Sequence, residues 1–374
     1  MSNLSFPEIK KNFGFGCMRL PMKDGEVDYA EFCRMIDAFI GAGFNYFDTA
    51  HGYIDGKSET AIRDCLAARY PRESYILTNK LSGPFFNKEE DILPLFESQL
   101  KACGVEYFDF YLMHAQNRNN FEKFKACRAY ETALELKKQG KIRHLGLSFH
   151  DTADILDKIL TEYPEVETVQ IQFNYADYED ASIESRKCLD VCRKHGKPAL
   201  VMEPVKGGSL VNLPPEADKI LRELDGGSNA SYAIRFAASF DGIIMVLSGM
   251  GNMAMMNDNL SYMTDFKPLS DEEFKAIGKV CAIFRAQDLI QCTDCKYCME
   301  CCPMHIPIPA FFACLNSKKV FTGWSADQYY GIIASSGIKA SDCIKCGMCE
   351  KACPQHLKVR DLLDEVADTF EKKK

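Results

Sequence analysis

Eight short apolar segments alternate with longer amphipathic segments between residue 14 and about residue 264 of this 374-residue chain. Each short segment is rich in aromatic or β-branched residues, as expected of a strand that is buried on both faces. The longer segments have helical periodicity, and the first of them places Phe32, Ile36, Phe39 and Ile40 along one stripe. The expected strands lie at 13–20, 44–50, 74–80, 107–114, 142–149, 168–174, 198–204 and 242–249.

This alternation predicts an α/β fold in which the strands are parallel and close into a (β/α)8 TIM barrel of about 250 residues. A doubly wound open sheet is the alternative. It would require a glycine-rich phosphate fingerprint after the first strand, and the segment GFGCMRLP matches that fingerprint only in part. We therefore expect the closed barrel.

Polar residues with useful chemistry stand at the ends of neighbouring expected strands. Asp48 ends the second strand and Tyr53 follows it in a loop, while Lys80 ends the third strand and His114 the fourth. Active sites of such barrels are built where the strands end, at their carboxyl edge. We therefore expect these four residues to lie together as a catalytic group.

The four side chains suit proton transfer to a carbonyl oxygen. A nearby ammonium group favours the phenolate, so we expect Lys80 to lower the pKa of Tyr53 and to make it a general acid/base. Asp48 would keep Lys80 charged, and His114 would orient the carbonyl oxygen. The alternative is a structural ion pair with an unremarkable tyrosine and histidine nearby. Four such residues at consecutive strand ends favour catalysis.

A cysteine motif, C-x2-C-x2-C-x3-C-P, occurs twice near the C-terminus, at 292–303 and at 343–354. This is the run of bacterial ferredoxins, in which the fourth cysteine binds the other cluster. A structural zinc site is the alternative, but it more often uses CxxC pairs separated by a longer loop. The remaining ten cysteines, Cys301 among them, are not expected to be ligands. We expect two [4Fe–4S] clusters, one on Cys292, Cys295, Cys298 and Cys353 and the other on Cys343, Cys346, Cys349 and Cys302.

These features divide the chain into a barrel at 1–264, a connecting helix at 265–284, and a smaller, mainly helical two-cluster domain with a C-terminal helix at 285–374. Ser270 and Glu273 form an expected capping box at the start of the connecting helix. Between the cysteine motifs, 308–321 and 325–336 are expected to be helices that pack on the barrel.

The barrel residues resemble the aldo-keto reductase family, specifically a subgroup with a ferredoxin-type tail. The segment NYFDTAHGYIDGKSE resembles its Asp and Tyr signature, LTNK its lysine strand and YLMH its histidine strand. The resemblance implies an oxidoreductase that uses NAD(P)(H) to interconvert a carbonyl and an alcohol on a small molecule. The cofactor contacts that it implies are Ser148, Gln172, Gly207, Gly208, Leu210, Ser248, Gly249, Asn252 and Asn259.

The chain departs from that family where NADP-dependent members bind the 2′-phosphate. Gly249 and Met255 stand where basic residues are expected. Either NAD replaces NADP, or Lys206 or Arg235 supplies the cation, or the site holds another phosphate-bearing cofactor. The pocket is expected to lack a tryptophan, because Trp324, the chain's one tryptophan, is expected to lie outside the barrel.

The combination of a barrel with a two-cluster domain leaves the source of the electrons open. A nicotinamide moves two electrons as a hydride, whereas each cluster passes one electron at a time. FMN in the barrel would accept both kinds of transfer, with ferredoxin or another electron-transfer protein as partner. The alternatives to the reductase are therefore a ferredoxin-linked relay through such a flavin and a non-catalytic electron carrier.

Composition restricts the partners and the compartment. A net charge of −8 argues against a nucleic-acid partner. Apolar runs are too short to span a bilayer, and no secretory signal is recognisable at the start of the sequence. Eighteen cysteines in such a chain indicate a reducing compartment. We therefore expect a cytoplasmic protein that acts on a small-molecule substrate.

Overall fold

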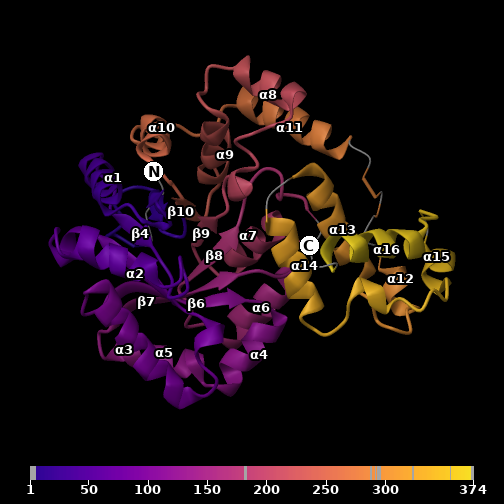
Figure 1. The fold of residues 1–374 in the computed structure, drawn as a ribbon, viewed down its shortest axis with the longest axis horizontal. Coiled ribbons are helices and arrows are strands. Elements are labelled where there is room, and N and C mark those ends of the chain that lie inside the picture. Colours follow the sequence, from indigo (N-terminus) through magenta and orange to yellow (C-terminus); the bar gives the residue numbers. More distant parts are fainter. Residues whose placement is uncertain are drawn as a thin grey trace.

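The computed structural model of the chain describes residues 6–180, 183–286, 289–290, 292, 296–321, 324–353 and 355–371. Its central feature is a barrel of eight parallel strands, closed in the order β1-β10-β9-β8-β7-β6-β5-β4 (Figure 1). The expected (β/α)8 fold is confirmed, and so is each of the eight expected strands. The barrel strands are β1 (Phe13–Gly16), β4 (Tyr46–Asp48), β5 (Ile76–Leu81), β6 (Phe108–Gln116), β7 (Ile142–Phe149), β8 (Thr168–Gln172), β9 (Ala199–Met202) and β10 (Ile243–Ser248).

Helices surround the barrel and cover the outer faces of its strands (Figure 1). Every residue of β5 and β10 is buried, because helices cover one face and the barrel interior covers the other. A short antiparallel ribbon, β2 (Met22–Lys23) and β3 (Glu26–Val27), follows β1. The barrel helices are α1 (Tyr29–Gly41), α2 (Lys57–Ile62), α3 (Ile92–Cys103), α4 (Arg118–Ala126), α5 (Ala129–Lys138), α6 (Ala153–Glu162), α7 (Ser185–Lys194), α8 (Pro215–Arg222), α9 (Asn229–Ala238) and α10 (Met253–Met263).

The barrel interior is filled by side chains. One buried cluster inside the barrel contains Tyr46, Phe110, Leu200 and Met245. Around this cluster the interior is packed with side chains and is not an open channel. A glycine is required where the interior is tightest. A Cβ atom at Gly146 would lie 2.5 Å from a side-chain carbon of Leu112 and 2.9 Å from the backbone oxygen of Thr168.

Helix α11 (Asp271–Arg285) follows the barrel and begins with the expected capping box. Glu273 N–H donates to Ser270 Oγ, and Ser270 N–H donates to the Glu273 carboxylate. The helix buries Ile277 and Val280 in the same core as the barrel helices. It therefore packs as part of the barrel domain in addition to connecting it to the following segment.

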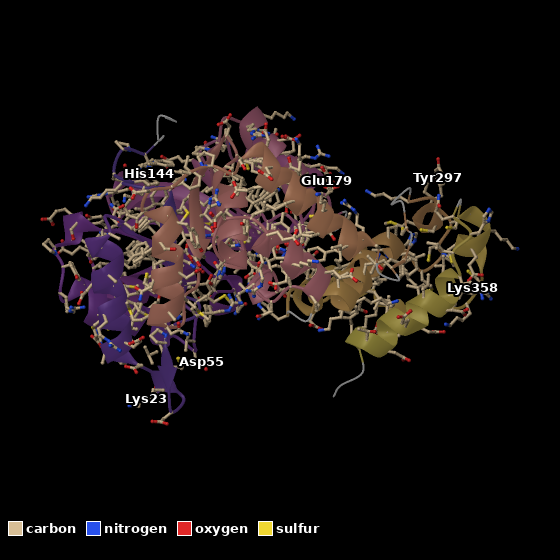
Figure 2. All side chains as sticks on the ribbon, turned by 90° about the horizontal axis from the view of Figure 1, so that it is seen from above. Lys23, Asp55, His144, Glu179, Tyr297 and Lys358 are labelled. Atoms are coloured by element: carbon tan, nitrogen blue, oxygen red, sulfur yellow. The ribbon has the colours of Figure 1, made fainter. Side chains whose placement is uncertain are left out.

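The C-terminal part of the chain is helical and has a core of its own. Helices α13 and α14 lie next to the barrel, and α12, α15 and α16 lie beyond them (Figure 1). Figure 2 shows this part, with Tyr297 and Lys358 labelled, at the opposite end of the molecule from Lys23. The helices are α12 (Tyr297–Glu300), α13 (Ile308–Val320), α14 (Ser325–Ala334), α15 (Met348–Ala352) and α16 (Val359–Phe370).

Both expected helices between the cysteine motifs are present, and both contact the barrel domain. Phe321, just after α13, packs edge-on against Phe284 of α11. On α14, the Tyr329 hydroxyl is 3.4 Å from His150 Nδ1, at the end of β7. The exact domain boundaries stay a prediction. None of the described helices is long and apolar enough to cross a lipid bilayer.

Candidate active site and cluster sites

Asp48, Tyr53, Lys80 and His114 meet at the carboxyl edge of the barrel. Lys80 Nζ donates hydrogen bonds to Asp48 Oδ1 at 2.6 Å and to the backbone oxygen of Thr49 at 2.8 Å. It also lies 3.2 Å from the Tyr53 hydroxyl. The rings of Tyr53 and His114 have centroids 6.0 Å apart and are nearly perpendicular. The structure therefore brings together all four residues that the sequence analysis selected.

The pKa of Tyr53 is shifted in the direction opposite to the expected one. Burial raises this pKa above its ordinary value, and the nearby Asp48 carboxylate adds to the rise; Lys80 lowers it but does not outweigh the other two effects. The expectation of a net lowering was therefore wrong, because it omitted the loss of hydration. For Lys80, burial alone would lower the pKa, but the Asp48 carboxylate and Tyr53 raise it, so the ammonium stays charged.

His114 is held by a residue that the sequence analysis missed. Ser82 Oγ, at the end of the neighbouring strand, is 2.6 Å from His114 Nδ1. Burial, the charge of Lys80 and the nearby His150 keep the pKa of His114 well below its ordinary value. The imidazole is therefore neutral at neutral pH, and among the described residues only its Nδ1 has a hydrogen-bonding partner.

A cavity of about 620 Å³ opens above these residues and is lined by Asp48, Tyr53 and His114. Its volume is in the range of small-molecule and cofactor sites. Trp324 and Gln328, from the C-terminal part of the chain, also line it. The expectation that Trp324 lies away from the barrel pocket was therefore wrong: the residue is distant in sequence but folds back over the barrel mouth.

The structure places two of the nine expected cofactor contacts, Ser148 and Gly249, on the cavity wall. Gln172 does not line the cavity; its amide donates to Asp177 at 2.7 Å. The cavity is lined instead by Gln170, whose amide donates to Asp48 Oδ2 at 3.1 Å. Gln170 is the register partner of Ser148 across β7 and β8, a pairing that the local sequence pattern does not fix.

Three further expected contacts, Gly207, Gly208 and Leu210, follow β9. Lys206, Gly207 and Gly208 have consecutive positive φ angles of 48°, 63° and 98°, which makes a tight turn that favours glycine. Gly208 has open space above it, whereas the side chain of Leu210 is fully buried in the core. A Cβ at Gly207 would lie 3.2 Å from the indole nitrogen of Trp324, so of these three residues only Gly208 is placed where a ligand could approach.

The other expected contacts follow β10. The Ser248 hydroxyl donates to Asn259 Oδ1 at 2.7 Å, and both residues are buried. The side chain of Asn252 caps the start of α10 by accepting from Met255 N–H. These hydrogen bonds hold the loop after β10 in place and do not involve side chains of the cavity wall.

Neither cation proposed for the 2′-phosphate is available to bind it. Lys206 is buried and forms an ion pair with Asp177. Arg235 makes hydrogen bonds of 2.7 and 3.0 Å to the two carboxylate oxygens of Glu273. Both side chains hold structural elements together, so using either for a ligand would leave a carboxylate without its partner.

The cysteines of the two motifs line two small cavities, and each cavity combines both motifs. Cys295 lies outside the described residues. Within the described part of the chain, no three possible ligands converge on a single metal ion. A cubane binds each cysteine through a different iron, so its ligands lie farther apart than those of one ion. One cavity is lined by Cys292, Cys298 and Cys353, and the other by Cys302, Cys343, Cys346 and Cys349.

Comparison with known proteins supports both halves of this description. The family model "Aldo/keto reductase family" matches residues 12–282, and the model "4Fe-4S dicluster domain" matches residues 291–358. The chain is 29% identical over 211 residues to an NADH-specific methylglyoxal reductase of Escherichia coli. That match covers 51% of this chain and 61% of the reductase, which is less than two thirds of the reductase's length.

Two solved structures share the barrel fold. An aldo-keto reductase of Bacillus halodurans in its holo form has a TM-score of 0.59 at 23% identity, covering 72% of this chain and 92% of that one. An aldo-keto reductase of Klebsiella pneumoniae, in complex with NADPH, has a TM-score of 0.59 at 19% identity, covering 73% and 95%. The first family model alone spans most of the chain, so this protein is an oxidoreductase that belongs to the aldo/keto reductase family.

Proposed function

We propose that this protein is an NADH-dependent reductase of a small carbonyl compound, with Tyr53 as the general acid. The observation that carries the proposal is the position of Lys80 Nζ, within hydrogen-bonding distance of both Asp48 and Tyr53 at the base of the cavity. A phenol that donates a proton becomes a phenolate, and a buried ammonium group stabilises that anion.

The side chains have distinct parts in the reaction. A bound nicotinamide supplies a hydride to the carbonyl carbon. The Tyr53 O–H bond breaks as its proton passes to the carbonyl oxygen, while Lys80 stabilises the phenolate. His114 is neutral, and on this proposal its Nδ1 accepts the hydroxyl proton of Ser82, so its one N–H is on Nε2 and donates to the same oxygen. In the reverse reaction Tyr53 would accept the proton from the alcohol.

The donors on the cavity wall fit the carboxamide of a nicotinamide. Ser148 Oγ accepts a hydrogen bond from Ala115 N–H at 2.8 Å, which leaves its own hydroxyl proton to donate. The Gln170 amide nitrogen donates to Asp48, so its carbonyl oxygen can face a ligand. One hydroxyl donor and one carbonyl acceptor are the groups that an amide requires. We assign Ser148 and Gln170 to this role.

NADH is proposed over NADPH because Lys206 and Arg235 are committed to carboxylates. A 2′-phosphate near Met255 would then have neither of these two cations to balance it. The name of the Escherichia coli relative is consistent with this choice. The names of the relatives above mention NADH and NADPH and no flavin, so FMN and a ferredoxin-linked relay stay alternatives without such support.

We further propose that the two cysteine-lined cavities hold the two [4Fe–4S] clusters. The ligand sets are those that the repeated motif predicts, with the fourth cysteine of each run serving the other cluster. The exchange of Cys302 and Cys353 between the two cavities supports this assignment. On this proposal the division into a barrel domain and a two-cluster domain follows the two family matches.

The test is NADH oxidation by anaerobically purified protein with a panel of small aldehydes and ketones, methylglyoxal included. The proposal predicts oxidation that depends on the carbonyl compound, with NADH preferred to NADPH. Denaturation of the same preparation should release no flavin, and iron analysis should give about eight irons per chain. Release of stoichiometric FMN, with no carbonyl-dependent oxidation of NADH, would favour the relay instead.

A further inference from the structure

Arg19 is a cation at the barrel mouth without a hydrogen-bonding partner among the described residues. Its side chain is 41% exposed, and Nη1 is 3.9 Å from Glu203 Oε1, which is too long for a hydrogen bond. The guanidinium carbon lies 5.9 Å from the ring centroid of Trp324. The cavity above the tetrad of Asp48, Tyr53, Lys80 and His114 is lined by Arg19, Glu203 and Trp324. The planar donor group of Arg19 is therefore available to a ligand.

The position of Arg19 is defined by two loops. It follows β1, which pairs directly with β10, and a Cβ atom at Gly249 would lie 3.6 Å from Arg19 Cβ and 3.8 Å from its Nη1. On the other side, Glu203 follows β9. In barrels of this kind the loops after the seventh and eighth strands form the usual phosphate site, and here those strands are β9 and β10. Arg19 thus lies where a cofactor phosphate is expected.

Glu203 is the unusual neighbour of this site. Its Oε2 is buried and has no hydrogen-bonding partner among the described residues. The same oxygen is 3.6 Å from the position that a Cβ of Gly207 would take. Burial raises the pKa of Glu203, and the charge of Arg19 opposes that rise. Glu203 lies near Arg19 but does not accept a hydrogen bond from its guanidinium group.

Trp324 brings the C-terminal part of the chain to the same place. Its indole nitrogen is 3.2 Å from the position that a Cβ of Gly207 would take, so the ring lies directly on the loop after β9. Helix α14 begins at the next residue and is anchored to the barrel through Tyr329 and His150. The cover over this loop is therefore fixed to the helices beside the clusters.

We propose that Arg19 binds the phosphate of the nucleotide cofactor and that Trp324 closes over that phosphate from the cluster-bearing part of the chain. This inference rests on the proposed function for the location of the cofactor. The chemistry is shared by the diphosphate of NADH and the monophosphate of FMN, because a guanidinium donates paired hydrogen bonds to phosphate oxygens.

The experiment measures cofactor affinity on anaerobic protein with its clusters intact, by calorimetry and by fluorescence of Trp324, the chain's only tryptophan. We expect NADH to quench this fluorescence and inorganic pyrophosphate to compete with NADH. Arg19→Met should weaken NADH about tenfold or more and abolish the competition, since charge-assisted hydrogen bonds are lost. Arg19→Lys should recover part of the affinity, and Glu203→Gln should increase it by removing a nearby acid.

Lys123→Met is the matched control. Lys123 is another cation on the cavity wall, but it already donates to the backbone oxygen of Gly83 at 2.7 Å, so this change should leave NADH affinity and pyrophosphate competition unaltered. Equal NADH affinity in wild type and Arg19→Met would overturn the inference and leave the proposed function standing. Arg19-dependent binding of FMN in place of NADH would support the inference and contradict the nicotinamide assignment. Binding of neither cofactor would overturn both.

Discussion

Lys80 Nζ and Asp48 Oδ1 form a hydrogen-bonded ion pair of 2.6 Å in which neither side chain is more than 5% exposed. The pair joins the ends of β4 and β5, and Gln170 completes the carboxylate from β8. A buried pair of this kind costs hydration for both charges, so its value lies in fixing Lys80 beside Tyr53. The relationship predicts a stability effect as well as a catalytic one.

Asp48→Asn should destabilise the barrel by about 3–5 kcal/mol, because it leaves a buried ammonium group without its counter-charge. The measurement is urea-induced unfolding followed by circular dichroism. Asp37→Asn is the control, since the side chains of Asp37 and of its partner Arg69 are 45% and 35% exposed. That change should cost no more than about 1 kcal/mol. Equal effects of the two substitutions would show that the inner pair is not special.

His150 should make the protein less stable in mild acid. Burial lowers its pKa from 6.5 to about 4, so the unfolded chain binds the proton more readily than the folded chain does between these values. The contribution of His150 to the free energy of unfolding is therefore fully present above pH 6.5 and decreases as the pH drops toward 4. The loss is about 2 kcal/mol between pH 7 and pH 5. Unfolding midpoints of wild type and His150→Asn across this range test the prediction.

His51 supplies a control of opposite sign. Its hydrogen bond to Glu59 raises its pKa above 6.5, so its contribution is present at low pH and is lost as the pH rises through the raised value. His51→Gln should therefore leave the acid-side loss in place or steepen it, whereas His150→Asn should flatten it. An unchanged acid-side slope in His150→Asn would contradict the assignment of the loss to that residue.

Gln170 and Gln172 should behave differently on substitution, although only one residue separates them. Gln170 lines the cavity, so Gln170→Met should weaken NADH binding about tenfold through loss of a hydrogen bond to the carboxamide. Gln172 is buried against Asp177, so Gln172→Met should lower stability by about 1–3 kcal/mol and leave NADH affinity unchanged. Calorimetric titration with NADH and unfolding measurements on both variants test these two predictions.

Cys353→Ser should remove the cluster that is expected on Cys292, Cys295 and Cys298, although Cys353 belongs to the second motif. Iron content should fall by about four per chain, since one cubane is lost. Cys301→Ser is the control: its thiol donates to the backbone oxygen of Cys298 and lies outside both cavities. Loss of iron in Cys301→Ser, or full retention of iron in Cys353→Ser, would show that the cysteines are assigned to the wrong clusters.

Most of the fold could be predicted because it depends on local patterns. Buried parallel strands are continuous apolar runs, and Ser270 with Glu273 marks a helix start by chemistry confined to four residues. The tetrad could be predicted because parallel neighbouring strands bring their ends to one edge. The grouping of the described cysteines in two cavities could be predicted because their spacing is itself the motif, and their role as cluster ligands stays a prediction.

The errors came from what the sequence leaves undetermined. The choice between Gln170 and Gln172 depends on the register of β8 against β7, which local pattern does not fix. Trp324 reaches the cavity through packing between parts of the chain that are far apart in sequence. The pKa of Tyr53 depends on burial, and a nearby Lys80 gives only part of that balance.

The central claim is that Tyr53 is the proton donor of a carbonyl reductase, and Tyr53→Phe tests it most directly. The measurement is carbonyl-dependent NADH oxidation by wild type and variant, with iron content and NADH affinity determined on the same samples. The account predicts a rate lower by about 10²–10⁴ with iron and NADH affinity unchanged, because the phenol proton is lost while Lys80 keeps its contact with Asp48. A Tyr53→Phe protein that turns over at the wild-type rate would contradict the account.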